Sequence, residues 1–341
     1  MKAIVYEQCG SPNVGQCEEI EKPIVGDSQV LIKVRAASVN PLEVSQVKGI
    51  PYLARLIFGL RKPEKGHRSQ LGVDVCGEVE AIGSKVTRFK AGDAVFGLCL
   101  NDPRASGAKA WVHDRGSFAE YVCASEATLE LEPDNVTFEQ AAAAGVAALT
   151  ALQGLRDYGH VQSGRNVLAN GSAGGVGTFA VQIAKAFGAD VTAVCSSRNV
   201  EMARSIGADH VVDYTQQDLR QLRHTYGVIL DCVSNRSLSQ CRRVLAPTGV
   251  CVMAGNLSGR SASATVRRLL SALVLSWMTA QKFTSFLAKP RQDDLTVLHD
   301  LMKAGKISPV VEKCYSLSEV SDALRYLQQK HARGKLVISV G

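Results

Sequence analysis

A glycine-rich stretch near the middle of the chain has the residue types and spacing of a phosphate-binding turn. Residues 170–177 read NGSAGGVG, between the apolar run NVLA and the segment TFAVQIAK. The strict fingerprint is G-x-G-x-x-G, and Ser172 stands at its first glycine. Glycines let a pyrophosphate approach the backbone, and the N–H groups of the following helix attract it. We therefore predict a dinucleotide site here, with an unliganded turn as the alternative. Its candidate residues are Ser172, Ala173, Gly174, Gly175 and Val176.

The residues after the next strand indicate which dinucleotide would bind. A site that prefers NAD has Asp or Glu near the end of that strand, where the carboxylate holds the ribose 2′-hydroxyl. Here Ser196, Ser197 and Arg198 follow the strand, and the first carboxylate is Glu201. Hydroxyl groups and a guanidinium suit a 2′-phosphate, because arginine forms paired, charge-assisted hydrogen bonds. We expect NADPH, with a merely solvated Arg198 as the alternative.

Alternating strands and helices surround the glycine turn and would hold it in place. Apolar runs predict strands at 166–170, 190–195, 210–213, 227–232 and 249–254. Helices are expected at 176–187, 199–206 and 237–245, and Thr137 with Gln140 fits a capping box that starts an earlier helix. This alternation is typical of βαβ units in a parallel sheet with helices on both faces. The tail predicts helices at 293–304 and 317–329 and a strand at 335–340.

The first third of the chain has a different pattern. Strand-like runs at 1–6, 29–35, 75–82 and 94–98 are separated by glycines and prolines, with no helix between them. A barrel-like or otherwise antiparallel β-domain is expected there. Two long segments, 49–70 and 101–116, interrupt this pattern, and long insertions of this kind are often functional lids.

Several motifs together resemble the medium-chain dehydrogenase/reductase superfamily. They are VNPLEV (39–44), FKAGDAVFG (89–97), GSFAEYV (116–122), GSAGGVGTFAVQIAKAFGA (171–189) and IGADHVVDY (206–214). Within the superfamily the chain is similar to the zinc-free quinone oxidoreductases of the zeta-crystallin type. Its tail is similar to the branch of the reticulon-interacting oxidoreductases. The likeness runs nearly end to end.

The resemblance implies a fold, an assembly and further site residues. The fold is α/β, with a GroES-like β-rich catalytic domain at 1–125, completed by 289–341, and a Rossmann doubly wound parallel-sheet domain at 126–288. Substrate and nicotinamide meet in the cleft between them, and the protein is a homodimer. Family positions near the cofactor correspond to Thr150, Tyr214 and Lys335. Many relatives have a lysine where this chain has Asn199, and the adjacent Arg198 would have to compensate for NADPH.

Zinc is not expected, because the ligands of related zinc enzymes are replaced. Their catalytic zinc is held by a cysteine, by the histidine of a GHE motif and by a distant cysteine. The matching segment here is LGVDVCG (71–77), with Val73 at the histidine position, and the first-cysteine region reads NPLEV (40–44). Their structural zinc lobe has four closely spaced cysteines, whereas none lies between Cys99 and Cys123. Zinc needs about four such ligands, so His67 and His113 are interpreted as loop residues.

Hydride transfer without a metal is easiest to a quinone or an enone, whose conjugation spreads the developing negative charge. The cofactor carries the chemistry, and the protein orients the reactants. A hydrogen-bond donor would stabilise the oxyanion. The first candidate is Asn40, whose amide can bond a substrate oxygen or the nicotinamide ribose. Tyr52 and Lys48 follow, with loop packing and a solvated charge as their respective alternatives.

The composition of the chain limits the partners that it could bind and the cellular compartments in which it could work. Hydrophobic residues make up 46% of the 341, the formal net charge is +7, and no run of five basic residues occurs, so a nucleic-acid partner is not expected. The ten cysteines form no C-x-x-C pair, which favours a reducing compartment. The first residues, MKAIVYEQCG, resemble a strand and not a signal peptide. We expect a cytoplasmic protein, with an organelle after processing left open.

The longest apolar stretch is LLSALVLSWMTA, at 269–280. Twelve residues are too few to span a bilayer. A buried helix is expected, and the alternative is a peripheral contact with a membrane or partner, helped by Arg267 and Arg268.

These observations favour an NADPH-dependent, zinc-independent reductase of quinones or α,β-unsaturated carbonyls. Two other readings stay open. One is an enoyl-thioester reductase, which would need a large acyl channel beside the 49–70 segment. The other is a non-catalytic NADPH-binding protein with a regulatory or structural role.

Overall fold

The computed structural model describes residues 1–6, 15–48, 69–100, 116–217, 225–254, 262–329 and 332–341. Its internal contacts divide the chain into two units. The first unit comprises 1–149, 289–305 and 309–341, and the second comprises 150–288 and 306–308. Residues 126–149 therefore cluster with the first unit, whereas we expected them in the Rossmann domain.

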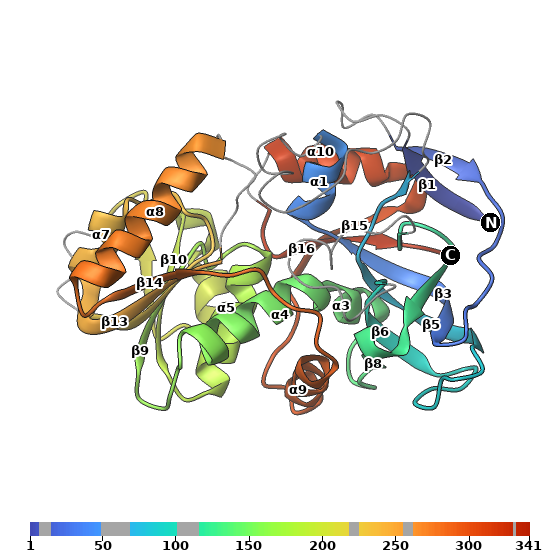
Figure 1. Cartoon of the computed structure of the whole chain (residues 1–341), viewed down its shortest axis with the longest axis horizontal. Coiled ribbons are helices and arrows are strands. Elements are labelled where there is room, and N and C mark those ends of the chain that lie inside the picture. Colours follow the sequence, from blue (N-terminus) through green and yellow to red (C-terminus); the bar gives the residue numbers. More distant parts are fainter. Residues whose placement is uncertain (7–14, 49–68, 101–115, 218–224, 255–261, 330–331) are drawn as a thin grey trace. The chain divides into compact units, whose positions relative to one another are not determined.

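The first unit is built on a seven-stranded sheet (Figure 1). Six of its strands follow the order β15-β16-β3-β5-β6-β8, and the seventh, β7, pairs with β3. All of its pairings are antiparallel except that of β15 with β16. The strands are β3 (Gln29–Val39), β5 (Asp74–Ile82), β6 (Ala94–Leu98), β7 (Tyr121–Ser125), β8 (Leu129–Leu131), β15 (Val311–Ser316) and β16 (Lys335–Ser339). A smaller sheet joins β2 (Gln16–Glu19), β1 (Lys2–Tyr6) and β4 (Ser69–Gln70). The antiparallel β-domain expected for the first third is confirmed.

Several helices accompany this sheet. They are α1 (Pro41–Lys48), α3 (Phe138–Ala143), α4 (Gly145–Gln153), α9 (Gln292–Lys303) and α10 (Val320–Gln329). The capping box of Thr137 and Gln140 is confirmed, since each side chain bonds the backbone N–H of the other residue. The helix expected from 317 begins as one 3-10 turn, Leu317–Glu319, and continues as α10.

The second unit is a six-stranded, fully parallel sheet in the order β11-β10-β9-β12-β13-β14. The strands are β9 (Asn166–Asn170), β10 (Asp190–Cys195), β11 (His210–Asp213), β12 (Tyr226–Asp231), β13 (Leu245–Met253) and β14 (Lys282–Ser285). The helices are α5 (Gly175–Ala186), α6 (Val200–Ser205), α7 (Leu238–Val244) and α8 (Ala262–Met278). A π-helical segment, Gly154–Tyr158, continues α4. The expected fold class is confirmed.

The strand order places a switch point beside β9. Successive strands extend the sheet from β9 through β10 to β11, and then in the other direction from β12 to β14. Right-handed crossovers put helices on opposite faces of the two halves. Ligands of such sheets bind outside the carboxyl ends of the strands where the order reverses. The turn after β9 lies at that point.

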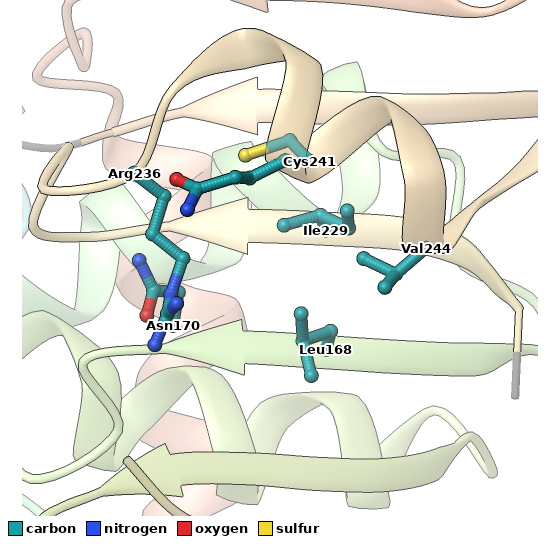
Figure 2. Close-up of a pocket in the computed structure, with 7 residues that line it drawn as sticks. Leu168, Asn170, Ile229, Arg236, Cys241 and Val244 are labelled. Atoms are coloured by element: carbon teal, nitrogen blue, oxygen red, sulfur yellow. The ribbon is translucent and has the colours of Figure 1, made fainter. Parts of the chain in front are cut away.

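A small hollow lies between α7 and strands β9 and β12 (Figure 2). Leu168, Ile229 and Val244 line it, and Asn170 and Arg236 lie at one end. Its free space suffices for about one water molecule. The hollow therefore holds no substrate.

Helix α8 is not buried, contrary to our expectation for residues 269–280. Ala272 is buried, but Leu273 is 65% exposed and Trp277 is 88% exposed. The stretch has apolar residues on both sides of the helix, and only one side can face the sheet. No helix among the described residues is long and apolar enough to cross a membrane.

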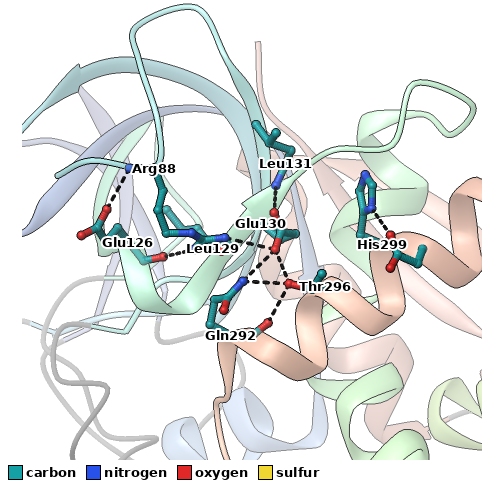
Figure 3. Close-up of polar contacts among 9 residues, drawn as sticks. Arg88, Glu126, Leu129, Glu130, Leu131, Gln292, Thr296 and His299 are labelled. Atoms are coloured by element: carbon teal, nitrogen blue, oxygen red, sulfur yellow. Dashed lines mark hydrogen bonds and ion pairs between the residues drawn. The ribbon is translucent and has the colours of Figure 1, made fainter.

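Helix α9 is fastened to the first unit by one carboxylate (Figure 3). Glu130 on β8 accepts hydrogen bonds from Thr296 Oγ1 at 2.6 Å, Gln292 Nε2 at 2.9 Å and the Arg88 guanidinium at 3.1 Å. Partial burial opposes the charged form of Glu130, but these donors outweigh it, and the pKa of Glu130 is lowered. The C-terminal segment thus belongs physically to the β-rich unit.

Replacing Thr296 by Val should loosen this attachment. The substitution keeps the shape of the side chain and removes the donor to Glu130, at an expected cost of about 1 kcal/mol in the free energy of unfolding. Urea unfolding measures it. Ser45→Ala, which removes a hydroxyl hydrogen-bonded within α1, is the control and should change stability by less; equal losses in both variants would contradict the prediction.

Candidate functional site

The glycine-rich segment forms the turn between β9 and α5. The side chain of Ser172 is fully buried, and its Oγ donates to Val194 O at 3.1 Å. The serine at the first glycine position therefore points toward β10. Gly174 is the N-cap residue of α5 and supplies no capping side chain. The first N–H groups of a helix have no partner within it, so the start of α5 can donate to an anion.

Two glycines of this turn have different surroundings. A Cβ on Gly177 would lie 2.1 Å from Gly171 O and 2.7 Å from Ser172 Cα. A Cβ on Gly174 would meet no atom nearer than Gly171 O, at 3.7 Å. Gly177 is thus required by packing inside the protein, whereas Gly174 leaves open space in front of the helix. The space in front of Gly174 is therefore open to a ligand, whereas the space beside Gly177 is filled by the protein itself.

The residues expected at the adenosine end are brought together by β10 and β11. Ser197 Oγ donates to Asp213 Oδ2 at 2.6 Å and lies 2.7 Å from Thr215 Oγ1. Tyr214 is 44% exposed, and its N–H bonds Cys195 O at 3.0 Å. Arg198 is exposed beside them. Hydrogen bonds from Ser197 and Thr215 hold the pKa of Asp213 below its usual range.

Asp213 was not among the predicted site residues. Asp213 is the last residue of β11, and helix α6 separates this strand from β10 in the sequence. No local pattern therefore connects Asp213 to Ser197. The sequence motif IGADHVVDY contains Asp213 but does not show what this residue faces. The parallel pairing of Cys195 with Asp213 brings its carboxylate to the 196–198 segment. Asn199 is buried, and its Nδ2 donates to Ser196 Oγ at 3.1 Å. The residue that replaces the family's lysine therefore shapes the loop.

In the first unit, polar side chains converge on one buried carboxylate. Asp74 has no exposure, Asn40 is 3% exposed and Lys335 is 4% exposed. Lys335 Nζ donates to Asn40 Oδ1 at 2.6 Å and to Asp74 Oδ2 at 3.2 Å, and Asn40 Nδ2 donates to Asp74 Oδ2 at 3.0 Å. Ser38 Oγ also bonds Asp74, and Val146 N donates to Asp74 Oδ1 at 2.7 Å from the start of α4. The cluster pairs one buried anion with one buried cation, as burial of charge requires.

A second buried carboxylate supports the cluster. Glu43 in α1 accepts from Asn40 N at 2.7 Å and from Val73 N at 3.2 Å. Burial, followed by the charge of Asp74, raises the pKa of Glu43 to about 7. Glu43 thus fixes the backbone of Asn40. Glu43 lies within the motif VNPLEV, and Asp74 lies within the segment LGVDVCG that was compared with the zinc enzymes. Nothing in their local sequence predicted that they meet.

The remaining predicted residues lie in different places. Lys48 is exposed at the end of α1, and Tyr52 is outside the described residues. Thr150 is half-buried in α4, and Ala173 and Val176 are half-buried in the glycine turn. Both polar groups of the Asn40 amide are engaged by Lys335 and Asp74. The structure therefore links Asn40 to Lys335, and no local sequence pattern connects these two residues.

The comparisons with known proteins agree with this architecture. Residues 26–134 match the family described as "Alcohol dehydrogenase GroES-like domain", and residues 206–338 match "Zinc-binding dehydrogenase". The "NADPH-dependent alkenal/one oxidoreductase, chloroplastic" of Arabidopsis thaliana is 31% identical, over 99% of this chain and 79% of that protein. The chain belongs to the medium-chain dehydrogenase/reductase superfamily.

Further members of the superfamily show the same likeness. The "NAD(P)H oxidoreductase RTN4IP1, mitochondrial" of Mus musculus is 33% identical, over 92% of this chain and 82% of that protein. The solved quinone oxidoreductase from Coxiella burnetii is 30% identical, with a TM-score of 0.81, covering 100% of this chain and 99% of the other. The resemblance to quinone oxidoreductases and to the reticulon-interacting branch is confirmed, and the superfamily's members named here are oxidoreductases.

The name of one matching family mentions zinc. Among the described residues, no group of three or more His, Cys, Asp and Glu side chains could hold a metal ion. His67 and His113 lie outside those residues. Zinc independence stays a prediction from the sequence.

Two alanine substitutions should separate the packing role of the glycine turn from its ligand role. Gly177→Ala should lower the free energy of unfolding by about 2 kcal/mol, because its Cβ overlaps the Gly171 carbonyl. Gly174→Ala should leave stability within about 0.5 kcal/mol and weaken NADPH binding about tenfold or more, because its Cβ fills space meant for the pyrophosphate. Urea unfolding and fluorescence titration give the two quantities. Normal NADPH affinity in Gly174→Ala would remove this turn from the nucleotide site.

The raised pKa of Glu43 should make stability depend on pH. The folded chain keeps this proton up to about pH 7, whereas the unfolded chain releases it near 4.5. Between these values the native state binds more protons, so the free energy of unfolding falls as pH rises. Glu43→Gln removes this titration, and the variant should gain up to about 3 kcal/mol relative to wild type across that window.

Urea unfolding of both proteins at about pH 4.5 and about pH 8 measures this change. Glu132, whose pKa burial also raises to about 7, is present in both proteins and cancels in the difference. A stability difference between variant and wild type that does not change with pH would contradict the assignment.

Proposed function

We propose that this protein is an NADPH-dependent oxidoreductase that reduces quinones or α,β-unsaturated carbonyls by hydride transfer without zinc. The observation that carries the proposal is the glycine turn at the switch point of the parallel sheet, followed by a helix whose start has no side-chain cap. When bound, the reduced nicotinamide supplies the hydride. The activities named for the alkenal/one and quinone oxidoreductase relatives support this substrate class.

The second unit would hold the nucleotide in two places. The turn from Ser172 to Val176 offers backbone N–H groups to the pyrophosphate. Ser196, Ser197, Arg198 and Tyr214 would hold the adenosine end. Arg198 attracts a 2′-phosphate, whereas the Asp213 carboxylate repels it and suits a 2′-hydroxyl. Hydrogen bonds from Ser197 and Thr215 keep Asp213 ionised, so for NADPH to be preferred the charge of Arg198 has to outweigh that of Asp213.

The first unit would supply a positioned cation. A lysine ammonium has three donors, and the hydrogen bonds of Lys335 in the described structure use two of them, to Asn40 and Asp74. The third can donate to the cofactor or to the developing oxyanion of the acceptor. Asn40 would then act through Lys335 by holding its Nζ in place. Lys48 and Tyr52 stay candidates for direct contact with substrate.

Two further predictions follow from the family. A homodimer is proposed, and β14 is the edge strand of the described parallel sheet that a second copy could extend. A cytoplasmic location is also proposed, although two of the relatives carry mitochondrial and chloroplastic in their names.

Stopped-flow oxidation of NADPH and NADH with quinones, enones and enoyl thioesters tests the function. Turnover of quinones or enones supports the proposal. Reduction of enoyl thioesters alone would favour the enoyl-thioester reductase reading. Binding of NADPH with no turnover on any acceptor would favour a non-catalytic role, and stoichiometric zinc in the purified protein would contradict the metal-free chemistry.

The choice of nucleotide should depend on Arg198. Arg198→Ala should raise the KM for NADPH about tenfold and leave that for NADH nearly unchanged, because only the 2′-phosphate pairs with the guanidinium. Arg204→Ala is the matched control, since Arg204 is paired with Glu201 on the exposed side of α6. A wild-type enzyme that prefers NADH, or an equal effect of Arg198→Ala on both nucleotides, would contradict the assignment.

A further inference from the structure

Helix α8 has an inward side and an outward side, and both are apolar. On the inward side Ala272 is 3% exposed, and Leu275 packs against the core. The outward side carries five large hydrophobic residues that are between 53% and 88% exposed. They are Leu270, Leu273, Val274, Trp277 and Met278, which we call the outer face of α8. Their i, i+3, i+4, i+7 spacing places them on one side of the helix.

The rotation of α8 is fixed, so this outer face cannot turn inward. The Arg268 guanidinium donates to Asp231 Oδ2 at 3.0 Å and to Arg236 O at 2.6 Å. Asp231 has no exposure, and breaking a buried ion pair is costly. Near the other end, Ser276 Oγ accepts from Phe283 N at 2.8 Å. Both anchors lie on the inward side.

Exposure of this kind needs an explanation. Single exposed hydrophobic residues are ordinary on protein surfaces, whereas a contiguous group marks an interaction site. Trp277 is 88% exposed, and tryptophan is enriched where an apolar surface meets water at a membrane.

The charges around the outer face have one sign. Residues 232–292 contain nine Lys or Arg and no Asp or Glu. Arg267 is exposed on α8 itself, Arg242 and Arg243 are exposed on α7, which packs beside α8, and Lys282 is exposed on β14. The Lys282 Nζ donates to Ser276 O at 3.3 Å, which places it beside the C-terminal end of α8. Arg268 is paired with Asp231, so its charge is already balanced inside the protein.

This combination selects among the surfaces that could cover the outer face. A two-fold dimer formed through the outer face itself, unlike the dimer proposed through the edge of β14, would bring the outer faces of both copies together. It would also bring together two sets of cations, and residues 232–292 offer no carboxylates to face them. An anionic lipid surface complements both features, because its headgroups attract Lys and Arg while the apolar side chains enter the boundary with the acyl chains.

We propose that the outer face of α8 binds the surface of an anionic membrane, with Trp277 and the leucines inserted and Arg267, Arg242, Arg243 and Lys282 against the headgroups. The helix lies in the plane of the interface. The proposal concerns a surface of the second unit and does not depend on the nucleotide chemistry.

Flotation of the full chain with vesicles tests the proposal. The protein should float with vesicles that contain phosphatidylserine and remain largely unbound with phosphatidylcholine alone. Added salt should weaken binding, because it screens the headgroup charges. The chain has two tryptophans, so Trp111→Phe leaves Trp277 as the only one. Its fluorescence should shift to the blue on binding and be quenched by brominated lipid.

Variants assign the binding to the named residues. Leu273→Ser with Trp277→Ser should reduce vesicle binding about tenfold or more, because two inserted side chains are lost. Arg242→Gln with Arg243→Gln should also reduce it about tenfold. Ile24→Ser is the matched control, because Ile24 is 91% exposed on the first unit and its replacement removes a comparable exposed side chain. All variants are checked for an unchanged thermal unfolding midpoint.

Three results would overturn the proposal. The first is no binding to phosphatidylserine vesicles at low salt. The second is binding that survives Leu273→Ser with Trp277→Ser, or that falls equally in Ile24→Ser. The third is a wild-type protein that binds neither kind of vesicle and sediments as a dimer, together with a monomeric Leu273→Ser, Trp277→Ser variant. A second copy of the chain would then cover the outer face.

Discussion

The closest approach of α5 to the turn after β9 is the contact on which the nucleotide-binding architecture depends. Gly177 lets the helix lie against the Gly171 carbonyl, where any Cβ would stand 2.1 Å from the oxygen. The approach aims the start of the helix at the point where the sheet reverses its strand order. The N–H groups there and the open space before Gly174 follow from it.

The first unit is organised around a different constraint, the buried charge of Asp74. Its carboxylate receives hydrogen bonds from Ser38, Asn40, Lys335 and the N-terminal turn of α4. These partners come from β3 and the residue that follows it, from β16 and from α4. The same arrangement that neutralises Asp74 also holds Lys335 in place, and among the described residues it uses two of the three donors of the ammonium group.

Local sequence patterns predicted much of the fold. The boundaries of β9, β10 and β11 agree with the predicted strands, because each is a short apolar run between turn residues. The capping box at Thr137 and the glycine turn at 170–177 are also encoded by residues close together in the sequence. The candidate site was predictable to the same extent: residues within one turn were recognised together, whereas Asp213 was missed because it reaches Ser197 only through strand pairing.

The sequence by itself determined the alternation of strands and helices, the glycine turn and the family, since all three are encoded in contiguous residues. Only the tertiary structure decided that Asn40 and Lys335, separated by 295 positions, share a hydrogen bond. It also decided that residues 269–280 expose their apolar side. Hydrophobic periodicity shows that a helix has an apolar face, but the packing of its neighbours determines which face is covered. Strand order and register likewise decide which distant side chains meet, and neither is written in any local pattern.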